Sequence, residues 1–220
     1  MWGEIGFLSA AAIFAFVAFL SLNLKIDDNR FSVILYGVAH IVASLAFLLW
    51  GLVLYGSVSL TLKNAVLIGD MLLIGSSILM ATSSFQKKSR AKVLIGSSVL
   101  GVLFLITRYA IIKPEPYIDN HILVFNSQVL VSIALVLIFA LAWFRTNIVL
   151  GTTIIKNSRE LQDLWTAWYF VNLLAFIGFC GFIVGKKPQT VALSFVALVT
   201  SYLVLGCFIY GAQRVAINGK

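Results

Sequence analysis

Long runs of apolar residues alternate with short polar segments along the whole chain. Seven runs have the length of a membrane span, since a bilayer core about 30 Å thick needs roughly 20 apolar residues in a helix. They cover residues 5–22, 31–55, 64–83, 93–112, 121–144, 165–184 and 191–211. Because the runs are continuously apolar, they predict helices, which satisfy their backbone hydrogen bonds within one segment. We therefore expect an all-α integral membrane protein, with one seven-helix transmembrane bundle over 1–220 and no soluble domain.

The basic residues of the polar segments gather on one side of this predicted bundle. Eleven fall in the first, third and fifth connections or after the last span: Lys25, Arg30, Lys87, Lys88, Arg90, Lys92, Arg145, Lys156, Arg159, Arg214 and Lys220. Four fall on the other side: Lys63, Lys113, Lys186 and Lys187. Because Lys and Arg favour the cytoplasmic face, we expect the N-terminus outside and the C-terminus in the cytoplasm. We expect an integral protein of the plasma or inner membrane whose chain crosses the bilayer several times.

The composition agrees with a membrane protein, since 61% of the residues are hydrophobic and 11% are charged. The formal net charge is +8. Its one-sided distribution is explained by membrane topology and by attraction to anionic lipid headgroups. We therefore expect the lipid bilayer as a partner, and no nucleic acid.

Polar residues of three successive spans are predicted to share one depth near the outer side. At a rise of 1.5 Å per residue, Asp70 lies about 9 Å inside the third span and Arg108 about 6 Å inside the fourth. These spans should be antiparallel neighbours, so we predict an Asp70–Arg108 ion pair, which lowers the cost of burying either charge. Asn126 and Gln128 of the fifth span reach the same layer.

Tyr109 and the connection 113–120 would cover this polar layer. Two interpretations follow. Ionisable residues within a span often mark a functional site, which here would be an outward-facing pocket for a ligand. Alternatively, the polar residues form an internal hydrogen-bonded network that locks the helices together.

A second, deeper group of polar and aromatic residues lies on three other spans: His40, Trp165, Tyr169, Asn172 and Ser201. The three residues of the sixth span are spaced i, i+4 and i+7, so they form one stripe of a helix. A cavity lined by this group would suit a small amphipathic ligand. The alternative is that the stripe packs helices together and His40 is a hydrogen-bonded core histidine.

Small residues predict close contacts between helices. They are Ala65 and Gly69 in the third span, Gly96 and Gly101 in the fourth, and Gly181 and Gly185, which form a GxxxG motif, in the sixth. The GxxxG motif also allows a homo-oligomer.

Patterns of catalytic residues are absent from the sequence. The chain has two histidines and two cysteines, with no Ser/His/Asp or Cys/His arrangement at one depth and no cluster of metal ligands. We expect a non-enzymatic protein without a metal or cofactor. The seven-span plan and residues 164–169 resemble microbial rhodopsins, but the seventh span, 191–211, has no lysine to carry retinal.

The longest connection, 145–164, mixes apolar and basic residues. We expect it to lie among the lipid headgroups and to contact a partner. The leading hypothesis is a sensor or receptor-like bundle that signals from an outward-facing polar site through a separate cytoplasmic or membrane partner protein. A small-solute or ion transporter and a structural membrane subunit of a larger complex are the alternatives.

Overall fold

The computed structural model describes residues 2–23, 30–83, 85, 87–112, 116–119, 122–125 and 188–218. Most of these residues lie in α-helices: α1 (Trp2–Leu22), α2 (Arg30–Leu54), α3 (Leu62–Ser83), α4 (Lys87–Ile106) and α7 (Pro188–Asn218). Helix α4 continues into a short π-helical segment, η2 (Thr107–Ile112). Two strands, β1 (Pro116–Asp119) and β2 (Ile122–Phe125), form an antiparallel hairpin.

Among the described residues, four segments have the length and composition needed to cross a membrane: Glu4–Leu22, Arg30–Leu54, Leu62–Ser83 and Lys87–Ile111. Helix α7 contains a shorter apolar stretch, Ala192–Cys207. The expected helical class is confirmed, and the apolar helices indicate a membrane location. The sixth span, most of the fifth, and the connection 145–164 lie outside the described residues.

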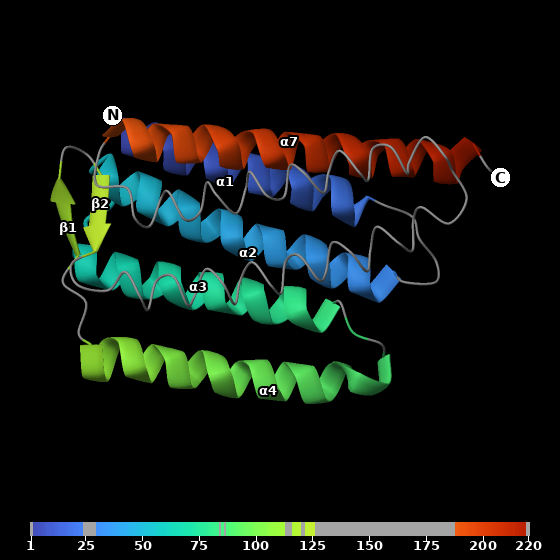
Figure 1. Ribbon diagram of the computed structural model, residues 1–220, viewed down its shortest axis with the longest axis horizontal. Helices are drawn as coiled ribbons and strands as arrows, with labels where there is room; N and C mark the ends of the chain where they lie inside the picture. Colours follow the sequence, from blue (N-terminus) through green and yellow to red (C-terminus); the bar gives the residue numbers. More distant parts are fainter. Residues whose placement is uncertain are drawn as a thin grey trace.

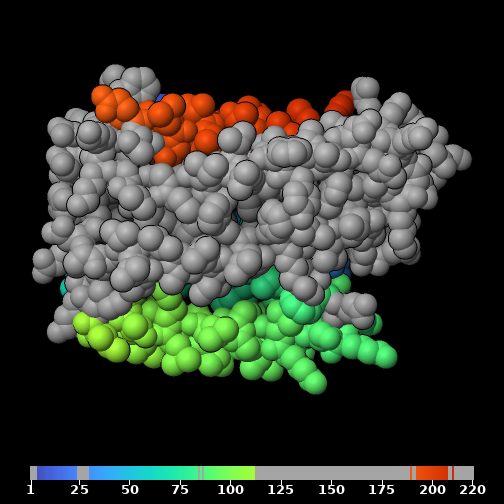
Figure 2. Space-filling model, in the orientation of Figure 1, coloured from blue at the N-terminus to red at the C-terminus, as the bar shows by residue number. Residues whose placement is uncertain are grey.

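The helices lie side by side with their long axes roughly parallel (Figure 1). From α1 to α4, each packs against the next in sequence, and α7 lies along α1, which gives the order α7–α1–α2–α3–α4. Short connections make consecutive helices antiparallel neighbours. In the space-filling view, α7 follows the upper edge of the molecule and α4 the lower edge (Figure 2).

The turn between α2 and α3 shows why these helices end and begin where they do. Gly56 has a φ of 79°, a left-handed conformation that glycine adopts at little cost. The amide of Gly56 donates to Val53 O at 3.1 Å, and that of Ser57 donates to Leu52 O at 3.0 Å. These two bonds form a Schellman motif, which terminates α2. Thr61 then caps α3, because its Oγ1 accepts from the Asn64 amide at 3.4 Å.

The hairpin corrects the predicted start of the fifth span. Helical structure was expected from residue 121, but Ile122–Phe125 is a strand that pairs with Pro116–Asp119. Ile122, Val124 and Phe125 belong to the β-branched and aromatic types that favour strands. Only two residues separate the strands, a length typical of a tight hairpin. The hairpin lies at one end of the bundle, with β1 against α3 and β2 against α1 (Figure 1).

The centre of the described bundle is an aromatic core shared by α1, α2 and α7. The Phe14 ring lies 4.1 Å from that of Tyr202 and 5.2 Å from that of Phe47, measured between centroids. Two serines add hydrogen bonds between helices: Ser44 Oγ donates to Ala11 O, and Ser76 Oγ donates to Ala39 O, both at 2.7 Å. Aromatic packing and these bonds hold α1, α2 and α3 together as a platform for the polar site.

Candidate functional site

The two ionisable residues predicted to pair do meet in the structure. Asp70 lies on α3, and Arg108 lies on η2. Arg108 Nε is 2.7 Å from Asp70 Oδ2, and only 2% and 5% of the two side chains are exposed. Burial of either charge alone would be costly, so their contact explains how both can lie within apolar helices.

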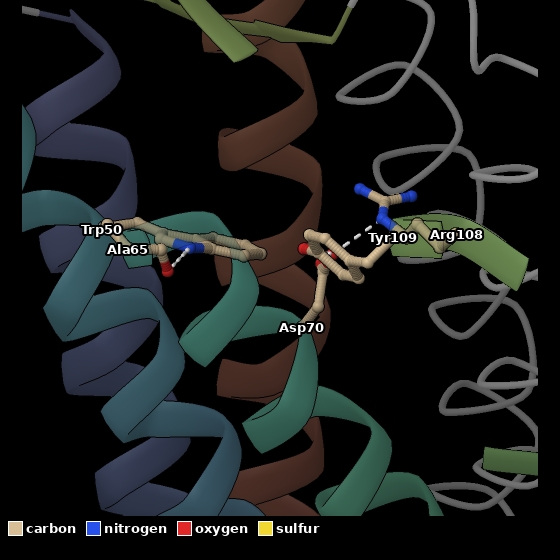
Figure 3. Close-up of polar contacts among 5 residues, drawn as sticks. All are labelled: Trp50, Ala65, Asp70, Arg108 and Tyr109. Atoms are coloured by element: carbon tan, nitrogen blue, oxygen red, sulfur yellow. Dashed lines mark hydrogen bonds and ion pairs between the residues drawn. The ribbon is translucent and has the colours of Figure 1, made fainter. Parts of the chain in front are cut away.

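Tyr109 is the third member of the cluster. Its hydroxyl donates a hydrogen bond to Asp70 Oδ2 at 2.6 Å, so Arg108 and Tyr109 reach the same carboxylate oxygen (Figure 3). The Arg108 guanidinium also lies 6.0 Å from the centre of the Tyr109 ring, within range of a cation–π interaction. Tyr109 was expected to cover the polar layer; in the structure it bonds directly to Asp70 within that layer.

The local backbone explains how two adjacent residues converge on one oxygen. Arg108 and Tyr109 lie in η2, whose π-helical turns are wider than those of an α-helix. Short π-helical segments interrupt α-helices frequently at functional sites. Here the segment lies where α4 faces the beginning of α3, at the end of the bundle that carries the hairpin (Figure 1).

Trp50 of α2 packs beside the cluster and was not among the site residues predicted from the sequence. Its indole Nε1 donates to Ala65 O at 3.1 Å, and a Cβ placed on Gly69 would overlap the indole ring. The tryptophan therefore packs against the backbone of α3 one residue before Asp70 (Figure 3). The available signal was Gly69, one of the small residues expected at a close helix contact.

Within the described part of the chain, α4 buries fewer side chains against the bundle than its neighbours do. None of its residues 87–106 is buried, whereas α2 and α3 each bury several residues. At its beginning, Arg90 Nη2 donates to Ser32 Oγ at 2.6 Å, and Arg90 Nε donates to Phe85 O at 3.0 Å. Among the described residues, the polar side-chain contacts of α4 and η2 with other helices therefore lie near the two ends, with an arginine at each.

Of the two close contacts predicted for small residues of α4, the one at Gly101 is confirmed and the one at Gly96 is not. A Cβ on Gly101 would come within 2.7 Å of Ile74 Cγ2, so this glycine does mark a contact with α3. A Cβ on Gly96 would meet nothing within 4 Å, so the predicted contact at Gly96 is wrong. Gly181 and Gly185 lie outside the described residues.

The deeper group is only partly described. His40 is fully buried, and its Nδ1 is 2.8 Å from Tyr36 O, so Nδ1 carries the proton and donates. Its ring lies 4.3 Å from Tyr36 and 5.7 Å from Tyr202, between centroids. Ser201 Oγ donates to Leu198 O within its own helix.

The remaining predicted site residues have no described position: Asn126, Gln128, Trp165, Tyr169 and Asn172. Within the described part of the chain, His40 is a core residue packed among aromatic rings. The same part contains no group of three or more His, Cys, Asp or Glu side chains that could hold a metal ion.

Comparison with models of known protein families, with curated proteins and with solved structures finds no match to this chain.

Proposed function

We propose that the protein is a non-enzymatic, receptor-like bundle of seven membrane-spanning helices, with the N-terminus outside and the C-terminus in the cytoplasm. In this proposal, a ligand enters from the outer side and acts on the Asp70–Arg108–Tyr109 cluster. Its binding changes how α4 docks on α3. The change reaches a separate partner protein through the basic cytoplasmic connections.

One observation carries the proposal: a buried ion pair attaches the end of a helix whose residues 87–106 are all half-buried or exposed. Arg108 and Tyr109 bind Asp70, while residues 87–106 of α4 include no buried side chain. A ligand shifts a conformational equilibrium only through different interaction energies with its two states. A ligand that competes for Asp70 or Arg108 meets this requirement, because it replaces a contact that exists only when α4 is docked.

The beginning of α4 is suited to transmit the effect of ligand binding to the partner protein. Lys87, Lys88 and Lys92 are exposed there, and the basic side of the bundle is expected to be cytoplasmic. A displacement of α4 at the cluster would therefore move a basic surface at the opposite membrane interface. Two distinct sites joined by one movable element are what an allosteric mechanism requires.

The test follows the position of α4 by distances between two spin labels. With Cys180 and Cys207 replaced by alanine, labels at Phe19 on α1 and Ala91 on α4 report the end remote from the cluster; both positions are exposed. Tyr109→Phe should add a second distance population in lipid nanodiscs, because it removes a bond to Asp70. Thr107→Val is the matched control, since that hydroxyl donates to Leu103 O of α4 itself.

If Tyr109→Phe and Asp70→Asn both keep the wild-type distance distribution, the position of α4 does not depend on the cluster and the mechanism is rejected.

A structural membrane subunit is the second candidate, favoured by the exposed apolar side chains of α4. They include Leu94, Ile95, Val99, Leu100, Val102, Leu103 and Ile106. If α4 is a fixed contact with another subunit, the same experiment should give one narrow distance population in every variant.

A further inference from the structure

The exposed side of α4 carries basic residues first and apolar residues after them. Six exposed residues of this helix recur at alternating intervals of four and three residues, a spacing that places them along one face. This face, the α4 stripe, consists of Lys88, Lys92, Ile95, Val99, Val102 and Ile106. Each of its four apolar side chains is more than half exposed. Gly101, which meets Ile74 of α3, does not belong to the stripe.

The apolar part of the α4 stripe has the length of one leaflet of a bilayer. From Ile95 to Ile106 the helix rises about 16 Å, and half of a hydrocarbon core of about 30 Å is about 15 Å. Lys92 and Lys88 precede this part by about one and two helical turns. Because long lysine side chains near the end of a span extend to the headgroup region, the stripe has the order of a phospholipid, with charge first and apolar length after it.

The charge of the stripe is complementary to an anionic headgroup. Helix α4 contains four basic residues and no Asp or Glu. Arg90 is engaged by Ser32 and Phe85, whereas in the described part of the chain no acidic side chain pairs with Lys88 or Lys92. Basic residues next to a span attract lipids with a net negative charge. The two lysines of the stripe are therefore available to a lipid phosphate.

A second copy of the chain fits this surface less well. Two copies with the same orientation in one membrane are related by a two-fold axis along the membrane normal, so pairing through the α4 stripe would place lysine against lysine. Such a juxtaposition of like charges is costly. Close contacts between membrane helices are also enriched in small residues, whereas the apolar part of the stripe consists of Ile and Val. Flexible acyl chains cover such a surface without a close approach of two backbones.

We propose that the α4 stripe is a binding site for an anionic phospholipid. The headgroup contacts Lys88 and Lys92, and the acyl chains lie along the four apolar residues of the stripe. This site differs from the general attraction of basic segments to the membrane surface, because it belongs to one face of one helix. It does not rest on the proposed receptor function.

The experiment measures which lipid contacts the stripe. In the full chain with Cys180 and Cys207 replaced by alanine, a bimane fluorophore is attached to a single cysteine at Val99. The protein is placed in nanodiscs of phosphatidylcholine with a minor fraction of phosphatidylglycerol, and the acyl chains of one lipid or the other carry bromine, which quenches a fluorophore in contact. The ratio of the two quenching efficiencies, each divided by the mole fraction of the brominated lipid, gives the local enrichment of the anionic lipid.

A label at Ile41 on α2 is the reference, because this position is also exposed and lies at a similar distance from the beginning of its helix. We expect phosphatidylglycerol to be enriched at Val99 and to be near its bulk fraction at Ile41. Lys88→Gln and Lys92→Gln should each lower the enrichment at Val99 roughly fivefold, and the double variant should abolish it. Lys87→Gln is the matched control, since it removes the same charge about 100° around the helix from Lys88 and should have a smaller effect.

Equal enrichment at Val99 and Ile41 would overturn the inference. An equal loss in the Lys87→Gln, Lys88→Gln and Lys92→Gln variants would also overturn it, because the attraction would then be diffuse. If neither brominated lipid quenches the label at Val99 while both quench the label at Ile41, protein covers the stripe and the lipid site is wrong.

Discussion

At the scale of single residues, Asp70 and Arg108 show how apolar helices accommodate charge. Each is almost entirely buried, and they contact one another at 2.7 Å. Tyr109 donates a further bond to Asp70, so the carboxylate has polar contacts in place of water. A buried ion pair often adds little net stability, but the loss of one partner leaves an uncompensated charge. The pair is therefore required as a unit.

Asp70→Ala and Arg108→Ala should each destabilise the protein by about 3–5 kcal/mol, because each removes the opposite charge that the remaining buried group contacts at 2.7 Å. The double variant should recover part of this loss. The measurement is the fraction of folded protein during unfolding with a denaturing detergent, with Lys63→Ala as an exposed control. If the losses of the single variants simply add in the double variant, the two residues are not coupled.

At the scale of helices, a close packing contact and an interhelical hydrogen bond hold α2 against α3. The Trp50 indole packs on Gly69 and donates to Ala65 O, and the Ser76 hydroxyl donates to Ala39 O. Small residues let helix backbones approach closely in membranes, and hydroxyls add hydrogen bonds between helices. On α4, Gly101 provides one such close contact with α3. Among the described residues, side-chain hydrogen bonds from α4 and η2 to other helices lie near the two ends, at Ser32 and at Asp70.

Gly69→Ala should destabilise the bundle by about 1–3 kcal/mol, the usual cost of an overpacked contact, because the new Cβ would overlap the rigid indole of Trp50. Gly96→Ala is the matched control within the bundle. Its Cβ would meet no atom within 4 Å, so it should be neutral or stabilise α4 by about 1 kcal/mol through helix propensity. Equal effects in the unfolding assay would refute the contact.

Ser76→Ala should cost about 0.6 kcal/mol, a typical value for a hydrogen bond between membrane helices. Ser77→Ala, at the next position, removes a hydroxyl that donates to Leu73 O of its own helix and should have a smaller effect. The difference between the two serine variants in one unfolding assay measures the contact between helices. A larger loss for Ser77→Ala would contradict this assignment.

At the scale of the whole molecule, the orientation of the bundle in the membrane decides from which side a ligand could reach the Asp70–Arg108–Tyr109 cluster. The cluster and the hairpin share one end of the bundle, and the exposed Lys87, Lys88 and Lys92 lie where α4 begins, at the other end (Figure 1). If basic segments face the cytoplasm, the cluster lies in the outer half of the membrane. A ligand would then reach it from outside the cell.

Single cysteines in a background without Cys180 and Cys207 test this orientation. A cysteine at Lys88 should resist a membrane-impermeant thiol reagent in intact cells and react after permeabilisation, because basic segments face the cytoplasm. A cysteine at Tyr117 in the hairpin should react in intact cells. The reversed labelling pattern would place the cluster on the cytoplasmic side and remove the proposed outer entrance.

The long apolar runs of the sequence were sufficient to locate α1 to α4 and most of α7, because membrane-spanning helices require such runs. It also identified Asp70 and Arg108, since ionisable groups in such runs are rare and need a partner at the same depth. The hairpin was missed because Ile122, Val124 and Phe125 are as apolar as a span. These residues form a strand and not a helix because their backbone pairs with that of residues 116–119.

The contact of Trp50 with Gly69 could not be read from the sequence, because its partners come from different helices whose rotation only packing fixes. The same holds for the exposure of Gly96 and for the π-helical turn that brings Tyr109 to Asp70. Hydropathy and charge thus determined the approximate positions of α1 to α4 and α7 and the charged pair. The tertiary structure decided which helix faces meet, because interdigitation of side chains depends on the three-dimensional shape of both surfaces.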